Sequence, residues 1–160
     1  MGNIDSLKQL IDVKKTIVGL DAYGVIYNQS GVFEKAKKVI EYCQSNSVPV
    51  YVLTNNATQS LIDISNSLHR MGISIAPECI VSSGVGCYLL PTIKQQLEGR
   101  STFVYGYKSS IYYAKKAGGI ITDDVEKADA IVMAASTGSN NHTVYHACFK
   151  RLKNNPSINF

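Results

Sequence analysis

Three polar segments directly follow apolar runs of the sequence, and their side chains could hold a polar ligand. The first is Asp21, the second is Thr54–Asn56 and the third is Ser82–Ser83. In open parallel sheets, ligands bind beyond the carboxyl ends of the strands. If the apolar runs are parallel strands, a carboxylate, hydroxyls and amides converge on one rim of the sheet. The spacing therefore predicts a ligand-binding site on that rim.

Helix capping is a plainer explanation for part of this pattern. Thr58 and Ser83 have side chains that commonly cap helix N-termini, and a helix is expected after each of them. Capping does not explain Asp21, which ends the first apolar run and is followed by Gly24 and a loop. No Walker-type loop is present, and Gly84–Gly86 is too short for a dinucleotide-binding fingerprint. Asp21 is therefore the leading candidate for chemistry.

Hydrophobic periodicity predicts the elements that must position these residues. Short apolar runs predict buried strands at residues 16–20, 48–53 and 79–81. Apolar residues at helical spacing predict helices near residues 4–11, 36–43, 61–71 and from 84 to about 98. Residues 21–31 are expected to form a loop. Continuous apolar strands alternating with amphipathic helices are typical of an α/β fold, with a parallel sheet buried on both faces and right-handed crossovers.

The alternation of strands and helices starts again after Gly99–Ser101, a segment whose composition suggests a junction between domains. Strands are expected at residues 102–105, 120–121 and 130–134, helices at 109–117 and 142–153, and a polar loop at 136–141. Two domains are therefore predicted, at residues 1–98 and 99–160. Residues 157–160 begin what resembles another strand. Because a domain rarely finishes inside an apolar element, we expect the chain to be truncated at its C-terminal end.

Composition restricts the class of protein. A chain of 160 residues with 45% hydrophobic residues suits one globular domain, or one domain and part of another. The net charge of +4 comes from scattered lysines, and the densest groups, at 35–38 and 150–153, fall on predicted helices. We therefore expect solvated helix faces and no nucleic-acid partner. No apolar stretch of 18 residues and no signal-peptide core occurs, so no membrane partner is expected.

The cysteines indicate the compartment. No C-x-x-C pair occurs, and each cysteine lies in an apolar pattern, namely Cys43, Cys79, Cys87 and Cys148. Buried reduced thiols are favoured over a zinc or redox site, so the expected location is cytoplasmic.

Two further groups of side chains could bind a ligand, although plainer roles are favoured. His142 and His146 are one helical turn apart and could bind a metal, but no third ligand is near, so surface or capping roles are expected. Four tyrosines could stack on a substrate, but packing is favoured because tyrosine commonly buries its ring: Tyr105, Tyr107, Tyr112 and Tyr113.

Asp21–Tyr27 and Val52–Asn56 together resemble motifs I and II of the haloacid dehalogenase-like (HAD) hydrolase superfamily. Asp21 and Thr54 are 33 positions apart, which leaves room for a loop and one helix but for no cap domain. The Thr-Asn-Asn motif and the new α/β unit after Gly99 are similar to subclass IIA, the NagD-like and 4-nitrophenylphosphatase-like enzymes. The resemblance implies a Rossmann-like HAD core followed by part of an α/β C2-type cap.

The resemblance also implies roles for five residues. The catalytic residues would be Asp21 and Tyr23; Asp21 would attack phosphorus and form an aspartyl-phosphate. The Asp21 carboxylate and the Tyr23 backbone carbonyl would bind Mg²⁺. The Thr54 hydroxyl and the Asn55 N–H would bind the phosphate of the substrate, and Asn56 would position the loop or the substrate. The implied partner is a small phosphorylated metabolite.

Two features depart from the family pattern. Tyr23 stands where phosphatases of the family have a second Asp, the general acid, whose loss typically lowers the rate by about 10²–10⁴-fold. The family's motif III lysine and motif IV acidic metal ligands follow the cap, so the remaining acidic ligands are absent from this chain. Asp123–Asp124 is the only acidic pair downstream, and a turn is expected there. Weak or absent phosphatase activity is therefore expected.

Two alternatives stay open. One is a non-catalytic HAD-fold binding protein, which the two departures favour. The other is a 2-haloacid dehalogenase-type hydrolase, because Asp21–Gly24 matches its motif I, in which the tyrosine is native and neither a metal nor a general acid is needed. Those enzymes place a cap between motifs I and II and usually have Thr where this chain has Val25. The architecture therefore favours the phosphatase group. An exposed sheet edge could also produce a homo-oligomer.

Overall fold

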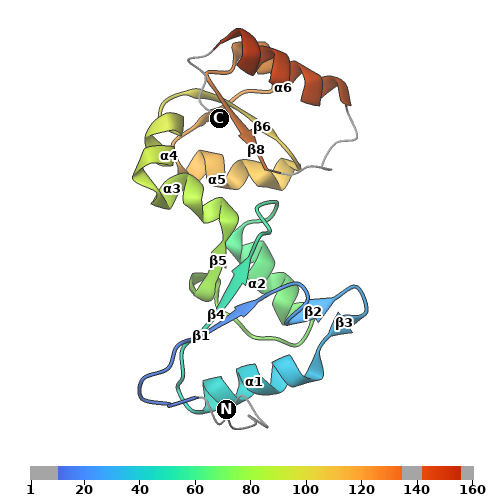
Figure 1. Cartoon of the computed structure of the whole chain (residues 1–160), viewed down its shortest axis with the longest axis vertical. Coiled ribbons are helices and arrows are strands. Elements are labelled where there is room, and N and C mark those ends of the chain that lie inside the picture. Colours follow the sequence, from blue (N-terminus) through green and yellow to red (C-terminus); the bar gives the residue numbers. More distant parts are fainter. Residues whose placement is uncertain (1–10, 135–141, 156–160) are drawn as a thin grey trace, which may run out of the picture. The chain divides into compact units, whose positions relative to one another are not determined.

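The structure, a computed structural model, describes residues 11–134 and 142–155, which form two compact units (Figure 1). Within the described residues, the first unit comprises residues 11–54 and 61–81, and the second comprises residues 55–60, 82–134 and 142–155. These are units of packing and do not test the expected core and cap domains, so the boundary between residues 98 and 99 stays a prediction.

The first sheet has the strand order β1-β4-β5 and contains the three strands expected from the apolar runs. They are β1 (Val18–Asp21), β4 (Val50–Thr54) and β5 (Ile80–Ser82). β1 and β4 are parallel, with Val18 opposite Val50 and Asp21 opposite Leu53. The last residue of each strand is polar, as the sequence predicted.

Two helices bury one face of this sheet, α1 (Glu34–Ser45) and α2 (Leu61–Arg70). The core joins strand residues such as Val52 to helix residues such as Ile40 and Leu68. The prediction that these strands are buried on both faces is wrong for the described residues. Tyr51, Leu53 and Val81 on the opposite face are 36%, 44% and 47% exposed. Side chains alternate between the faces of a strand, and helices of the described chain cover only one of them.

The segment predicted as a loop at residues 21–31 contains a small antiparallel hairpin. β2 (Tyr27–Asn28) pairs with β3 (Gly31–Val32), and the Asn28 side-chain oxygen accepts a hydrogen bond from the Ser30 N–H at 2.8 Å. Strands of two residues are too short to show an alternating pattern, so hydrophobic periodicity did not reveal them. The hairpin and α1 occupy the interval between Asp21 and Thr54.

The second sheet has the order β7-β6-β8, and its neighbouring strands are parallel. The strands are β6 (Ser101–Tyr105), β7 (Ile120–Ile121) and β8 (Ala130–Met133), and the helices include α5 (Ile111–Lys116) and α6 (His142–Asn154). Short 3₁₀ turns occur at Pro77–Cys79, Ser83–Val85, Lys108–Ser110 and Val125–Lys127. The strands predicted at residues 102–105, 120–121 and 130–134 and the helices predicted at 109–117 and 142–153 are confirmed.

The helix expected from residue 84 to about 98 is instead two helices, α3 (Gly86–Leu89) and α4 (Pro91–Leu97). Leu90 between them is extended, with φ −84° and ψ 113°. The ring of Pro91 disfavours the helical conformation in the residue before it, whereas proline is well tolerated in the first turn of the next helix. The continuous helix was therefore a wrong prediction.

Several predictions concern residues outside the described ranges. These are most of the helix near residues 4–11, the polar loop at 136–141 and the strand at 157–160. The four cysteines are free thiols; Cys43 and Cys148 are buried, whereas Cys79 and Cys87 are half-buried. Among the helices of the described ranges, none is long and apolar enough to cross a membrane.

Candidate functional site

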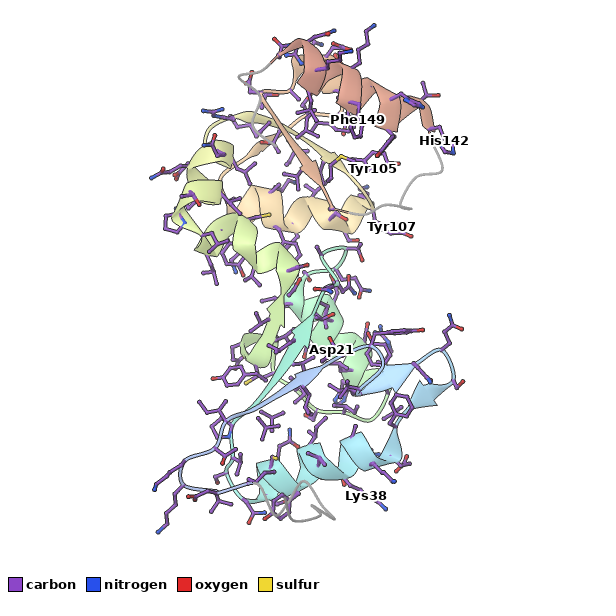
Figure 2. The ribbon with its side chains drawn as sticks, viewed as in Figure 1. Asp21, Lys38, Tyr105, Tyr107, His142 and Phe149 are labelled. Atoms are coloured by element: carbon purple, nitrogen blue, oxygen red, sulfur yellow. The ribbon has the colours of Figure 1, made fainter. Side chains whose placement is uncertain are left out.

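Asp21 is an exposed carboxylate at the carboxyl end of β1 (Figure 2). Because β1 and β4 are parallel, Asp21 and Thr54 lie at the same end of the sheet, with Asp21 opposite Leu53 in the register. The backbone continues this pairing, since the Ala22 N–H donates to the Leu53 carbonyl at 2.9 Å. No residue of 11–134 or 142–155 forms a hydrogen bond or ion pair with the Asp21 side chain. The carboxylate is therefore accessible to an external ligand.

Tyr23 lies in a tight turn just after β1. The Ile26 and Tyr27 N–H groups donate to the Ala22 carbonyl, and the Gly24 N–H donates to the Tyr27 carbonyl at 2.7 Å. Gly24 has φ +90°, a conformation that side chains other than glycine rarely adopt. The Tyr23 ring is 57% exposed and meets Tyr27 edge to face at 5.9 Å. The turn therefore directs a phenol into solvent two residues after Asp21.

The predicted binding segment divides into residues with different environments. Thr54 is the half-buried last residue of β4, Asn55 is exposed and Asn56 is half-buried. The Asn56 side-chain oxygen accepts hydrogen bonds from the Thr58 N–H at 2.9 Å and the Thr58 hydroxyl at 2.6 Å. The Asn56 side-chain amide donates to the Gln59 side chain at 3.0 Å. The Asn56 side chain is thus hydrogen-bonded within its own loop, and its predicted role toward a substrate stays a prediction.

The capping explanation needs a correction. Ser82, not Ser83, caps the 3₁₀ turn at residues 83–85, because its hydroxyl accepts the Gly84 N–H at 3.1 Å. Ser83 instead donates its hydroxyl to the Asn55 carbonyl at 3.1 Å, and Thr58 bonds to Asn56 three residues before α2 begins. The segment of residues 82–83 therefore supports the loop that follows Thr54.

The other candidate groups differ in their surroundings. His142 and His146 are exposed on α6, and Asp124 caps a 3₁₀ turn by accepting the Glu126 N–H at 3.0 Å. Tyr105 and Tyr113 are buried, whereas Tyr107 is 49% exposed. The favoured packing role is thus found for Tyr105 and Tyr113.

Two oxygen atoms next to the end of β1 are of the kind that a hard metal ion binds. Asp21 and the Tyr23 backbone carbonyl are oxygen ligands close together in the chain, of the kind that Mg²⁺ prefers. Across 11–134 and 142–155, no three His, Cys, Asp or Glu side chains gather as a metal cluster. Mg²⁺ usually binds one or two carboxylates and keeps several waters. These two oxygen atoms could therefore be part of the protein's contribution to a Mg²⁺ site.

The sequence model of the family described as haloacid dehalogenase-like hydrolase matches residues 18–119, which include Asp21, Tyr23 and Thr54–Asn56. A curated relative, the acid sugar phosphatase of Staphylococcus aureus (strain USA300), is 26% identical over 114 residues, which are 71% of this chain and 43% of that protein.

Solved structures share the fold. A possible sugar phosphatase of the HAD superfamily from Cytophaga hutchinsonii has a TM-score of 0.77 and 23% identity, and the match covers 96% of this chain and 56% of that one. NagD from Escherichia coli K-12 has a TM-score of 0.66 and 22% identity, with 86% and 53% covered. The glycerol phosphate phosphatase of Mycobacterium tuberculosis, in complex with calcium, has a TM-score of 0.67 and 19% identity, with 82% and 38% covered.

These similarities confirm the predicted α/β fold class and the predicted resemblance to NagD-like HAD proteins. The chain spans 43% of the length of the curated relative and 38–56% of the lengths of these three structures.

Proposed function

The chain belongs to the haloacid dehalogenase-like hydrolase family, and on that basis we propose that it is a phosphatase-type hydrolase of a small phosphomonoester. The observation that carries this proposal is the parallel pairing of β1 with β4, which end in Asp21 and Thr54. The similarity of the chain to an acid sugar phosphatase supports a small phosphomonoester as the substrate class.

Asp21 is the proposed nucleophile. One oxygen of its carboxylate attacks phosphorus, the bond from phosphorus to the leaving oxygen breaks, and the electron pair departs with that oxygen. Water then hydrolyses the aspartyl-phosphate, which releases orthophosphate and restores the carboxylate. The Thr54 hydroxyl and the Asn55 N–H donate hydrogen bonds to the phosphate oxygens. The exposure of Asp21 supports this assignment, because a nucleophile must be accessible to the substrate.

Mg²⁺ is the proposed cofactor, with the Asp21 carboxylate and the Tyr23 backbone carbonyl as its ligands in this chain. When bound, the ion supplies positive charge that offsets the negative charge of the transferring phosphoryl group.

We also propose that turnover is weak. Tyr23 occupies the position of the family's general acid, and a phenol is a much weaker acid than a carboxylic acid. The leaving oxygen must therefore take its proton from solvent. The same residue favours the second candidate, a non-catalytic HAD-fold binding protein that holds a phosphorylated ligand without turning it over.

Hydrolysis of 4-nitrophenyl phosphate with Mg²⁺ tests the proposal. We expect slow release of nitrophenolate that Asp21→Asn abolishes, because the carboxamide is not a nucleophile. The control is Asp123→Asn, which alters an exposed aspartate of the second unit and leaves the rate unchanged. Turnover that survives Asp21→Asn contradicts the proposal, and phosphate binding without turnover supports the binding protein. Chloride release from 2-chloropropionate would instead indicate a dehalogenase.

The proposed setting is the cytoplasm, with a small phosphorylated metabolite as partner and with neither nucleic acid nor membrane. The free thiols of Cys43 and Cys148 support a reducing compartment. Self-association through the exposed part of the first sheet is also proposed.

A further inference from the structure

The loop of residues 55–60, which directly follows Thr54, is held by side-chain hydroxyls from two distant segments of the second unit. On one side, Ser82 donates to the Asn56 carbonyl at 2.7 Å and Ser83 donates to the Asn55 carbonyl. On the other, Tyr113 donates to the Gln59 carbonyl at 2.8 Å and Ser109 donates to the Thr58 carbonyl. Four of the six backbone carbonyls of the loop thus accept a side-chain hydroxyl.

We propose that Tyr113 and Ser109 are positioning residues that fix this loop in the conformation that presents the Asn55 N–H to phosphate. The effect on phosphate rests on the proposed function, whereas the effect on the loop does not. Neither residue is proposed to touch the substrate.

The Tyr113 side chain is held rigidly enough to fix what it bonds to. Its residue is 2% exposed, its ring stacks on Tyr88 at 6.4 Å, and Tyr112 meets it edge to face at 5.0 Å. Gly84 leaves room only for a hydrogen, since a Cβ there would lie 2.4–2.8 Å from carbons of the Tyr113 ring. The ring therefore has no space to swing toward Gly84, and the hydroxyl is aimed at the loop before any ligand binds.

Burial also keeps Tyr113 a donor. Desolvation raises the pKa of the Tyr113 phenol, and the neighbouring Ser82 hydroxyl partly opposes this. The phenol consequently stays protonated at neutral pH and keeps the proton that it donates to the Gln59 carbonyl.

The loop needs this support because its own contacts are short-range. The Asn56 side chain bonds to Thr58 and Gln59, both within three residues. Ser109 and Tyr113 are more than 50 residues from the carbonyls that they bond, so they attach the loop to η4 (Lys108–Ser110) and α5. A donor that is already ordered when phosphate arrives avoids the entropy cost of ordering it during binding.

Hydrogen exchange of the 160-residue chain tests the loop directly. In Tyr113→Phe the ring stays and the bond to Gln59 is lost, so we expect amide exchange within residues 55–60 to rise about tenfold. The matched control is Tyr112→Phe, whose hydroxyl contacts Lys116 at 3.4 Å and not the loop. Exchange that is equal in the two variants, or raised evenly through the whole chain, overturns the proposal.

Ser109→Ala provides a second variant should Tyr113→Phe fold poorly, because residue 109 is exposed and its loss creates no cavity. The same local rise in exchange is expected for it. An unchanged loop in well-folded Ser109→Ala and Tyr113→Phe contradicts the positioning role.

Binding of orthophosphate, followed by isothermal titration, separates this proposal from the proposed function. With the loop loosened, Tyr113→Phe is expected to raise the phosphate Kd about three- to tenfold relative to Tyr112→Phe. If phosphate binds all variants equally, the positioning role is wrong although the proposed function stands. If the unmodified chain binds no phosphate, the proposed function is contradicted. Hydrogen exchange in residues 55–60 then tests by itself whether Tyr113 and Ser109 fix the loop.

Discussion

At Asp21 the chain places an accessible carboxylate at the end of a strand, and at Tyr23 it places a phenol where the family's phosphatases have a general acid. The tight turn after β1 sets their spacing through hydrogen bonds to the Ala22 carbonyl. The two residues have opposite consequences for the proposed reaction. Asp21 supplies the attacking oxygen, whereas Tyr23 leaves the departing oxygen without an acidic side chain.

Replacing Tyr23 by Asp should therefore increase phosphatase activity. Because Tyr23 is 57% exposed, the smaller side chain loses little beyond the edge-to-face contact with Tyr27. A carboxylic acid two residues after the nucleophile can protonate the leaving oxygen. We expect kcat/KM for glycerol phosphate, whose alkoxide leaving oxygen needs a proton, to rise by about 10²-fold or more, measured as release of orthophosphate. Tyr107→Asp, at a tyrosine that is 49% exposed, is the control and should give no gain. An unchanged rate in Tyr23→Asp would show that proton donation does not limit turnover.

At the scale of elements, α2 follows the loop that carries Asn55 and Asn56, and one of its faces packs in the core of the first unit. Ile64 and Leu68 are buried in the core of the first unit, whereas Ile62 on the same helix is 57% exposed. This amphipathic division is the one expected from the spacing of apolar residues in the sequence.

Truncating a side chain of α2 to alanine should therefore change the free energy of unfolding by an amount that depends on the helix face on which the side chain lies. Leu68→Ala removes a side chain that is 1% exposed and should lower the free energy of unfolding by about 2–5 kcal/mol, because it leaves a cavity. Ile62→Ala should change it by less than about 0.5 kcal/mol, as is usual for surface positions. Urea unfolding followed by circular dichroism measures both. Equal effects of the two substitutions would mean that α2 does not pack as described.

At the scale of the whole molecule, each compact unit has its own sheet and its own core. In the first unit, the sheet face opposite α1 and α2 carries exposed apolar side chains, including Tyr51, Leu53 and Val81. Contiguous exposed apolar surface is commonly a contact site. We therefore assign the proposed self-association to this face of the sheet, whereas the sequence suggested a sheet edge.

We expect the chain to self-associate as its concentration rises, and Tyr51→Lys to weaken this association because it places a charge on the apolar face. Ile62→Lys adds the same charge on α2 and should leave the association unchanged. Light scattering over a range of concentrations measures the mass of each variant against the 17.5 kDa of one chain. A constant single-chain mass for the unmodified protein would contradict the proposal.

The sequence by itself determined the order of the elements, the α/β class and the family, because buried strands, amphipathic helices and the motifs around Asp21 and Thr54 are local patterns. It also predicted that Asp21, Thr54 and Ser82 stand at strand ends. Two of its errors were local features that periodicity does not resolve, namely the hairpin β2–β3 and the break at Leu90.

Only the tertiary structure decided which sheet face is covered and how the loop of residues 55–60 is held. Strand patterns do not reveal whether a helix covers an apolar face, as Leu53 shows. The hydrogen bonds from Ser109 and Tyr113 join residues more than 50 positions apart, and no local pattern specifies such pairs. The physical reason is that hydroxyls and carbonyls occur throughout a chain, and folding alone determines which of them come within hydrogen-bonding distance.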